Sequence, residues 1–241
     1  MKNKKNKIFK ETFFPKNKKA SHVGFAIAFV IFISFLIFFY AMFKPAIRIG
    51  DDKKVILKQL ENKIIKNVSA DLITISIKKD SLENCSKINL SSLNISYTNF
   101  TVRNNQGIIN SNLSLGNLIV ENKSNFFKIY ASNESFNLSE NHLCTSFSNY
   151  TVGLIRTEKY IFETKVIWLI NYYNNSYETL KDDFEISDIN DFSFSFIYNN
   201  NTEIKTNEKN VSISVYADSI PINYINKNAS IEVGYIKIKI W

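Results

Sequence analysis

The pattern of hydrophobic and polar positions begins with an unbroken apolar segment near the N-terminus. Residues 23–43 are 21 consecutive residues without a charge, and a helix of about 20 apolar residues is long enough to cross the hydrocarbon core of a bilayer. We therefore expect a transmembrane helix over residues 21–44, preceded by a basic cytoplasmic tail or leader over residues 1–20. No other window of the sequence is comparably apolar.

The next segment has a helical period. Pro45 lies at the end of the apolar segment, where it is expected to kink or end the helix, and Asp51 and Asp52 are suited to the start of a new one. The apolar positions that follow are spaced by one or four residues: Val55, Ile56, Leu60, Ile64 and Val68. This spacing predicts an amphipathic helix over about residues 52–67, within a stalk helix assigned to residues 45–68.

Beyond residue 68 the apolar positions mostly alternate with polar ones, which is typical of half-buried β-strands. Strands are expected at residues 73–77, 93–102, 118–120, 126–131, 150–157, 192–198, 211–217, 222–225 and 231–241. Gly234 lies where the alternation of the last strand shifts phase, which suggests a β-bulge.

One segment within this region returns to a helical period. Its apolar positions follow steps of four and three residues from Phe162 to Phe184. They predict one long helix over residues 164–183 with Thr164 as its N-cap. The whole pattern predicts an α+β fold, in which residues 69–241 form an extracytoplasmic domain with a mainly antiparallel sheet and this helix on one face.

The net charge of +8 is concentrated in the first 20 residues, which hold eight lysines and one glutamate, a net of +7. Residues 21–241 therefore carry only +1, which argues against nucleic acid as a partner. Lysines beside a membrane span mark its cytoplasmic side and attract anionic lipid headgroups. We expect a single-pass protein of the cell membrane with its N-terminus in the cytoplasm, its C-terminal domain outside and membrane lipid as a partner.

Sequons of the form Asn-x-Ser/Thr are the most frequent motif after the span. The 29 Asn and 33 Ser or Thr of residues 50–241 would give about five sequons by random placement, and fourteen occur. The N-glycosylation candidates are Asn67, Asn84, Asn89, Asn94, Asn99, Asn112, Asn122, Asn133, Asn137, Asn149, Asn174, Asn200, Asn210 and Asn228. Glycans require exposed positions in an exported domain. The alternative is that an Asn-rich composition inflates the count.

The chain has two cysteines, Cys85 and Cys144, and both follow the span. An even number in an exported domain favours a disulfide between them. Two unpaired thiols are the alternative interpretation.

Residues for catalysis or metal binding are sparse. His22 adjoins the span, and His142 has only Cys144 near it in sequence, which is too little for a tetrahedral metal site. An acidic run offers oxygen ligands but lacks the spacing of a calcium-binding loop, and a solvated helix end explains it better: Asp182, Asp183, Glu185, Asp188 and Asp191. No phosphate-binding loop, dinucleotide motif or nucleophile elbow is present. We therefore expect neither an enzyme nor a cofactor or metal site.

The N-terminal junction Lys18-Lys19-Ala20-Ser21-His22-Val23-Gly24-Phe25 resembles the class III signal peptide of archaeal type IV pilin-like proteins. The resemblance implies cleavage near Ala20 and Ser21 on the cytoplasmic side, and packing of the apolar helix into a filament core. The glutamate usual at the fifth mature position is missing, because Phe25 or Gly24 stands there. An uncleaved signal anchor remains the alternative.

The C-terminal run from Ile220 to Trp241 resembles the ending of uncharacterised, N-anchored archaeal ectodomain proteins. Together these observations predict a glycosylated cell-envelope protein with a structural or interaction role, either a pilin-like subunit that self-assembles or one that binds envelope proteins. The alternative function is an anchored ectodomain that binds a ligand or partner as a sensor or receptor.

Overall fold

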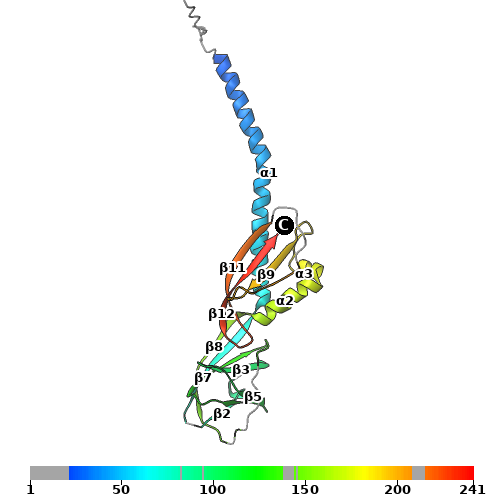
Figure 1. Cartoon of the computed structure of the whole chain (residues 1–241). Helices are drawn as coiled ribbons and strands as arrows, with labels where there is room; N and C mark the ends of the chain where they lie inside the picture. Colours follow the sequence, from blue (N-terminus) through cyan, green and yellow to red (C-terminus); the bar gives the residue numbers. More distant parts are fainter. Residues whose placement is uncertain (1–21, 82, 94, 138–143, 145, 208–214) are drawn as a thin grey trace, which may run out of the picture. The chain divides into compact units, whose positions relative to one another are not determined.

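The computed structural model describes residues 22–81, 83–93, 95–137, 144, 146–207 and 215–241, with only the backbone described for residues 44–52. The fold is α+β, with an N-terminal apolar helix and a mostly antiparallel, β-rich domain that carries two further α-helices in its described part (Figure 1). The chain divides into two compact units between Asp51 and Asp52.

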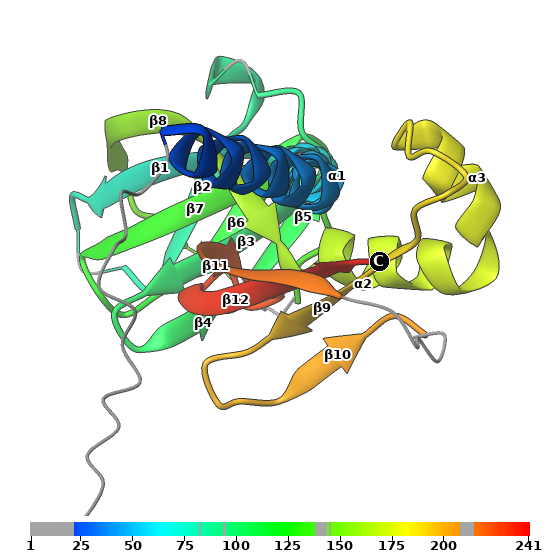
Figure 2. The same cartoon turned by 90° about the horizontal axis from the view of Figure 1, so that it is seen from above.

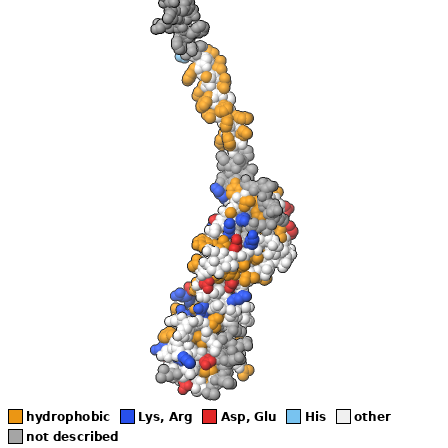
Figure 3. Space-filling model, viewed as in Figure 1, with side chains coloured by type: hydrophobic (Ala, Val, Ile, Leu, Met, Phe, Trp, Pro, Cys, Tyr) orange, Lys and Arg blue, Asp and Glu red, His pale blue; other side chains and the backbone are white. Residues whose placement is uncertain are grey.

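The first helix, α1, runs from His22 to Val68 over 47 residues. The expected break at Pro45, and a new helix start at Asp51 and Asp52, are therefore wrong. Proline removes only one backbone donor from the ladder, and the hydrogen bonds on either side of it allow the helix to continue. The segment His22–Phe43 has a mean hydropathy of 2.7 and none of it is buried, so it is long and apolar enough to cross a membrane (Figure 3).

The larger sheet has nine strands in the order β10-β9-β12-β11-β8-β1-β7-β3-β4 (Figure 2). All neighbours are antiparallel except β11 and β8, which are parallel and pair only at Tyr224–Ile161 and Ile225–Phe162. The strands are β1 (Ser69–Lys79), β3 (Asn99–Asn104), β4 (Gly107–Ile109), β7 (Phe126–Ser132), β8 (Tyr150–Phe162), β9 (Phe192–Ile197), β10 (Glu203–Lys205), β11 (Tyr216–Ile225) and β12 (Ile231–Ile240).

A smaller antiparallel sheet has the order β2-β6-β5. Its strands are β2 (Cys85–Asn89), β5 (Ser111–Ser114) and β6 (Asn117–Glu121). It packs on one face of β1, β7 and β3 through a cluster of buried residues that includes Ile75, Ile129 and Val120. This packing leaves the opposite face of β1, β7 and β3 for other contacts, because successive side chains of a strand point to opposite faces.

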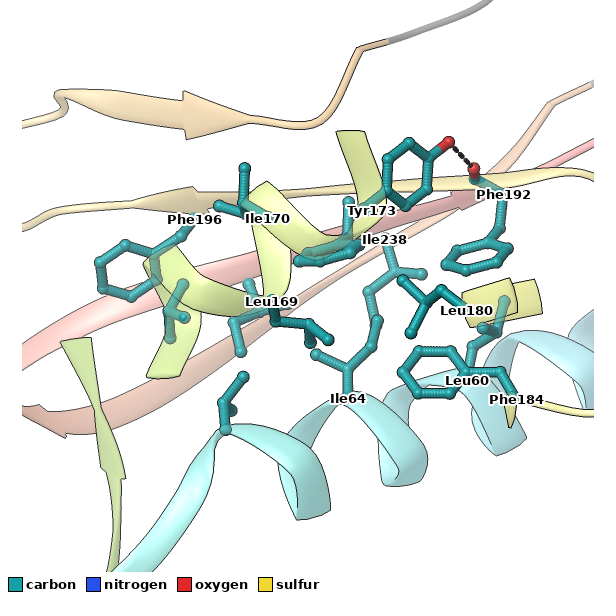
Figure 4. Packing of buried hydrophobic residues seen from close by; sticks show 14 of the residues in the cluster. Leu60, Ile64, Leu169, Ile170, Tyr173, Leu180, Phe184, Phe192, Phe196 and Ile238 are labelled. Carbon is teal, nitrogen blue, oxygen red and sulfur yellow. Dashed lines mark hydrogen bonds between the residues drawn. The ribbon is translucent and has the colours of Figure 1, made fainter. Parts of the chain in front are cut away.

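The largest hydrophobic core joins α1, two later helices and strands β9 to β12 (Figure 4). Leu60, Ile64 and Val68 of α1 have no exposed surface, which confirms the three-to-four residue spacing of the helical pattern. They pack with residues such as Leu169 and Ile238. Burial of side chains of this size stabilises the folded state by about 1.5–3 kcal/mol each.

The helix expected over residues 164–183 is two helices, α2 (Glu163–Asn175) and α3 (Tyr177–Asp183), which meet at Ser176. The apolar period was correct, because Val166, Leu169, Tyr173 and Leu180 are all buried. Thr164 does not cap the helix as expected. Its hydroxyl donates instead to Glu134 Oε2 at 2.8 Å, and α2 has no side-chain cap.

Two strand predictions also need correction. Residues 93–102 are not one strand, because a 3-10 helix, η1 (Ser91–Leu93), precedes β3 and the strand begins only at Asn99. Gly234 is not a bulge but a regular ladder position opposite Ile222. Glycine is required there for space, since a Cβ would lie 2.8 Å from the Ile197 carbonyl oxygen and 3.2 Å from the rings of Phe196 and Tyr224. The predicted strand 211–217 lies mostly outside the described residues.

Candidate functional site

The sequons of the described chain are mostly on its surface. Twelve of the fourteen lie within the described residues, Asn94 and Asn210 lying outside them. Ten side chains are exposed: Asn67, Asn84, Asn89, Asn112, Asn133, Asn137, Asn149, Asn174, Asn200 and Asn228. Asn99 is half-buried, and its Nδ2 donates to the Asn133 carbonyl at 3.0 Å. The fold is therefore geometrically compatible with attachment of glycans at most of these positions.

Asn122 is the exception, because its side chain is only 4% exposed. Its Nδ2, the atom that a glycan would modify, donates to the Ser124 carbonyl at 2.7 Å. Its Oδ1 accepts from the Ser124 amide at 3.0 Å and from Asn104 Nδ2 at 3.3 Å. The side-chain amide of Asn122 therefore closes a turn with Ser124. This structural role competes with glycosylation of Asn122.

The predicted disulfide is present. Cys85 at the start of β2 and Cys144 are joined, with 6.0 Å between their Cα atoms and a sequence separation of 59 residues. The described chain holds no free cysteine. The bond ties the smaller sheet to the segment that leads into β8.

Other sequence candidates are either outside the described residues or engaged in structure. Ala20, Ser21 and His142 lie outside them. Within the acidic run, Glu185 Oε2 accepts from Lys63 Nζ at 2.6 Å and Asp191 Oδ1 accepts from Tyr177 at 2.7 Å. In the part of the chain that the structure describes, no group of three His, Cys, Asp or Glu side chains could hold a metal ion.

A groove lies on the face of β3, β7, β1 and β8 that the smaller sheet leaves uncovered. Two adjoining cavities of about 420 and 350 Å³ make up this groove, and Ser76, Lys128, Tyr130 and Ile231 line both of them. The turn between β11 and β12 forms one wall with Ala229, Ser230 and Ile231. We call it the sheet-face groove.

Three cations from three strands meet in the sheet-face groove: Arg103 of β3, Lys128 of β7 and Arg156 of β8. Arg103 and Lys128 are directly opposite each other across the strand pair, an arrangement of like charges that destabilises a sheet. Arg103 donates to the Asn228 carbonyl at 2.7 Å. Among the described residues no carboxylate pairs with Arg103 or Lys128, and the groove therefore favours a negatively charged occupant.

Arg156 has a partial counterion within the groove. Its Nη1 lies 3.5 Å from Glu158 Oε1, and both side chains are well exposed, so the pair adds little to stability. The Tyr160 hydroxyl donates to the other Glu158 oxygen at 3.2 Å. Glu158 is the one carboxylate among the residues that line the groove, so its charge offsets only one of the three cations.

Two phenols complete the polar lining. Burial raises the pKa of Tyr130, and the nearby Arg103 charge opposes this shift. Burial also raises the pKa of Tyr160, and the Glu158 carboxylate that accepts its hydrogen bond adds to the effect. Both phenols are therefore neutral at physiological pH and can offer hydrogen bonds and an aromatic face beside the cations.

Sequence reasoning missed this groove, although a signal was present. The chain contains only three arginines, and the two that follow Arg48 are Arg103 and Arg156. All other positively charged residues after Arg48 are lysines. Arg103 and Arg156 both line the sheet-face groove, although they are 53 residues apart in the sequence. Arginine differs from lysine by its planar, bidentate donor geometry, which suits carboxylate and phosphate groups.

Comparisons with known proteins do not identify a function, so any functional interpretation rests on the geometry described above. No protein-family model matches the chain, and no curated protein or solved structure matches it either.

Proposed function

We propose that the protein is a membrane-anchored, glycosylated cell-envelope protein whose extracytoplasmic domain has a structural or interaction role. The observation that carries this proposal is the fully exposed apolar segment His22–Phe43. An isolated helix of this length and hydropathy is unfavourable in water and stable in a bilayer. The disulfide supports an oxidising compartment for the domain that follows, and the ten exposed sequons agree with export.

The test is the membrane association of the full-length protein. Wild-type protein should remain in the membrane pellet after alkaline carbonate extraction and dissolve only in detergent. Phe32→Lys with Leu36→Lys places two charges in the span, each costing about 2.5–3.5 kcal/mol, and should release the protein. The matched control Phe32→Leu with Leu36→Phe should stay in the membrane. Release of wild-type protein by carbonate would contradict the anchor.

A pilin-like form of this role would have its leader removed and its apolar helix packed against other copies. The single helix α1, which begins in the apolar segment and ends at Val68, supports this form of the role. An N-terminus at Ala20 or Ser21 in the native protein, measured by mass spectrometry, would favour it. An N-terminus at Met1 would favour an uncleaved signal anchor.

A second candidate function is ligand binding, and the convergence of Arg103 and Arg156 carries it. We infer that the sheet-face groove binds a ligand bearing carboxylate or phosphate groups. Isothermal titration of the full-length protein in detergent with trigalacturonate and with inorganic phosphate would test this, with maltotriose as the neutral control. Arg103→Lys and Arg156→Lys keep the charge but lose the bidentate geometry, so each should weaken binding by about tenfold.

The matched control for this experiment is Lys205→Gln, because Lys205 is an exposed cation on β10 away from the groove. It should leave binding unchanged, whereas Lys128→Gln should weaken it. Equal affinity of all variants, or equal affinity for maltotriose, would contradict an anion site in the groove.

A further inference from the structure

The strand β8 has a long edge without a partner. On one side it pairs with β1 from Tyr150 to Ile161. On the other side β11 pairs only with Ile161 and Phe162, and no described strand pairs with that edge between Tyr150 and Tyr160. The exposed backbone donors and acceptors of such an edge are a template for another strand.

The side chains along this edge are also exposed to solvent. Every residue from Gly153 to Lys159 is exposed, although β8 stands in the middle of the strand order. Leu154 and Ile155 are 60% and 45% exposed. A strand in this position is normally covered along its whole length by the next strand of its sheet, whereas β11 pairs with only the end of β8.

The sequence of the edge is complementary to itself. In an antiparallel pair of two β8 strands centred on Thr157, Arg156 of each copy lies opposite Glu158 of the other. The same register places Leu154 opposite Tyr160 and Ile155 opposite Lys159. Opposite charges that face each other across strands stabilise a pair, and like charges destabilise it.

Neighbouring registers lack this complementarity. A two-fold axis at Arg156 would place the two arginines opposite each other, and an axis at Glu158 would do the same to the two glutamates. Only the register centred on Thr157 matches both charges, and its paired stretch stops before Ile161, where β11 begins to pair. Within one chain Arg156 and Glu158 are only 3.5 Å apart and well exposed, so they can exchange partners at little cost.

We propose that two copies of this chain associate through β8, as an antiparallel strand pair with a two-fold axis at Thr157. The surface of such a pair is isologous, as in most symmetric dimers. This inference names one partner for the interaction role proposed above. It is tested by cross-linking and not by membrane extraction or ligand binding. The dimer and the proposed functions can therefore fail independently of one another.

A cysteine at the two-fold axis tests the register directly. The only two cysteines of the chain are joined in the disulfide, so Thr157→Cys introduces a single free thiol. In the proposed pair the two copies of residue 157 are directly opposite, with Cβ atoms about 5 Å apart. Mild oxidation of the full-length protein in native membranes should therefore give a covalent dimer.

Thr151→Cys is the matched control, because Thr151 is exposed, lies on the same strand and is the same residue type. In the proposed register the two copies of residue 151 are twelve positions apart, about 40 Å along the strand. Thr151→Cys should give no dimer above background. A dimer yield for Thr157→Cys that does not exceed that of Thr151→Cys overturns the proposal.

A charge exchange in the Thr157→Cys background tests the chemistry of the pair. Arg156→Glu and Glu158→Arg each place like charges opposite one another and should weaken association by about tenfold. The double variant Arg156→Glu with Glu158→Arg restores both cross-strand pairs and should restore the cross-link. Circular dichroism of each variant verifies the fold, and the two single variants are independent tests if one of them is unstable. Unchanged cross-linking in the single variants, or no recovery in the double variant, overturns the proposal.

Discussion

Substitution of Gly234 by alanine adds one methyl group at the centre of an aromatic cluster. The rings of Phe196 and Tyr224 lie perpendicular to each other with centroids 5.0 Å apart. The new Cβ would lie 3.2 Å from an atom of each ring and 2.8 Å from the carbonyl oxygen of Ile197. The rings can shift by a few tenths of an ångström, but the carbonyl belongs to the strand next to β12 and cannot move alone.

The magnitude follows from two opposing effects. Replacement of glycine by alanine at an unstrained position stabilises a protein by about 0.4–1 kcal/mol, because the unfolded chain loses conformational freedom. Overpacking of a dense core costs about 1–3 kcal/mol. Because Gly234 is buried and a Cβ there would approach a backbone atom, the second effect should dominate. We expect the free energy of unfolding to fall by about 1–2 kcal/mol, and the melting temperature by about 4 °C.

The assay is thermal unfolding of the full-length protein in detergent, followed by near-ultraviolet circular dichroism of the aromatic residues. Gly153→Ala is the matched control, because a Cβ there meets only ordinary contacts, at 3.4 Å to the Ser76 carbonyl oxygen and 3.6 Å to the Ser76 Cβ. That variant should be as stable as wild type or slightly more stable. If Gly234→Ala were as stable as Gly153→Ala, the steric reasoning would be refuted.

Three further outcomes follow from the described contacts. Burial and the Glu232 carboxylate raise the pKa of Tyr224 above its ordinary value of 10.0, so its contribution to stability is present below pH 10 and falls as the pH rises beyond it. The stability advantage of wild type over Tyr224→Phe, about 1 kcal/mol at pH 8, should therefore shrink by about 1.4 kcal/mol per pH unit above pH 10 in urea titrations. Replacement of Cys85 and Cys144 by serine opens a loop of 59 residues and should lower the free energy of unfolding by about 4 kcal/mol, and equal urea midpoints would contradict this. Ser124→Ala should leave the glycan mass of the native protein unchanged because Asn122 is buried, whereas Ser230→Ala should remove one glycan if exposed Asn228 is modified, and a glycan loss in Ser124→Ala would contradict the structural role of Asn122.

The local elements were predictable because they follow from burial with a fixed period. Leu60, Ile64 and Val68 each lie on the buried face that the three-to-four spacing indicates, and the alternation of Phe192, Phe194 and Phe196 correctly predicted β9. The break at Ser176 was not predictable, because the apolar period of α2 continues through it into α3.

The position of Gly234 shows a second limit of sequence reasoning. A phase shift in the pattern suggested a bulge, but the glycine is needed because the Ile197 carbonyl oxygen and the Phe196 ring of a different strand approach it closely. The sheet-face groove has the same origin, because Arg103, Lys128 and Arg156 become neighbours only through the register of β3, β7, β1 and β8. Properties of this kind depend on strand order, and a single sequence does not encode strand order in a local pattern.

The largest core has a consequence for the biogenesis of the protein. It combines Leu57, Leu60 and Ile64, which emerge first from the ribosome among its members, with Ile236, Ile238 and Ile240, which emerge about 170 residues later. Contacts of such long sequence separation form slowly and cannot form before both segments are available. While the chain is being translocated, the apolar face of residues 57–68 must therefore remain uncovered. A chaperone or the membrane surface that shields this face until β12 arrives would set the rate at which the folded domain appears.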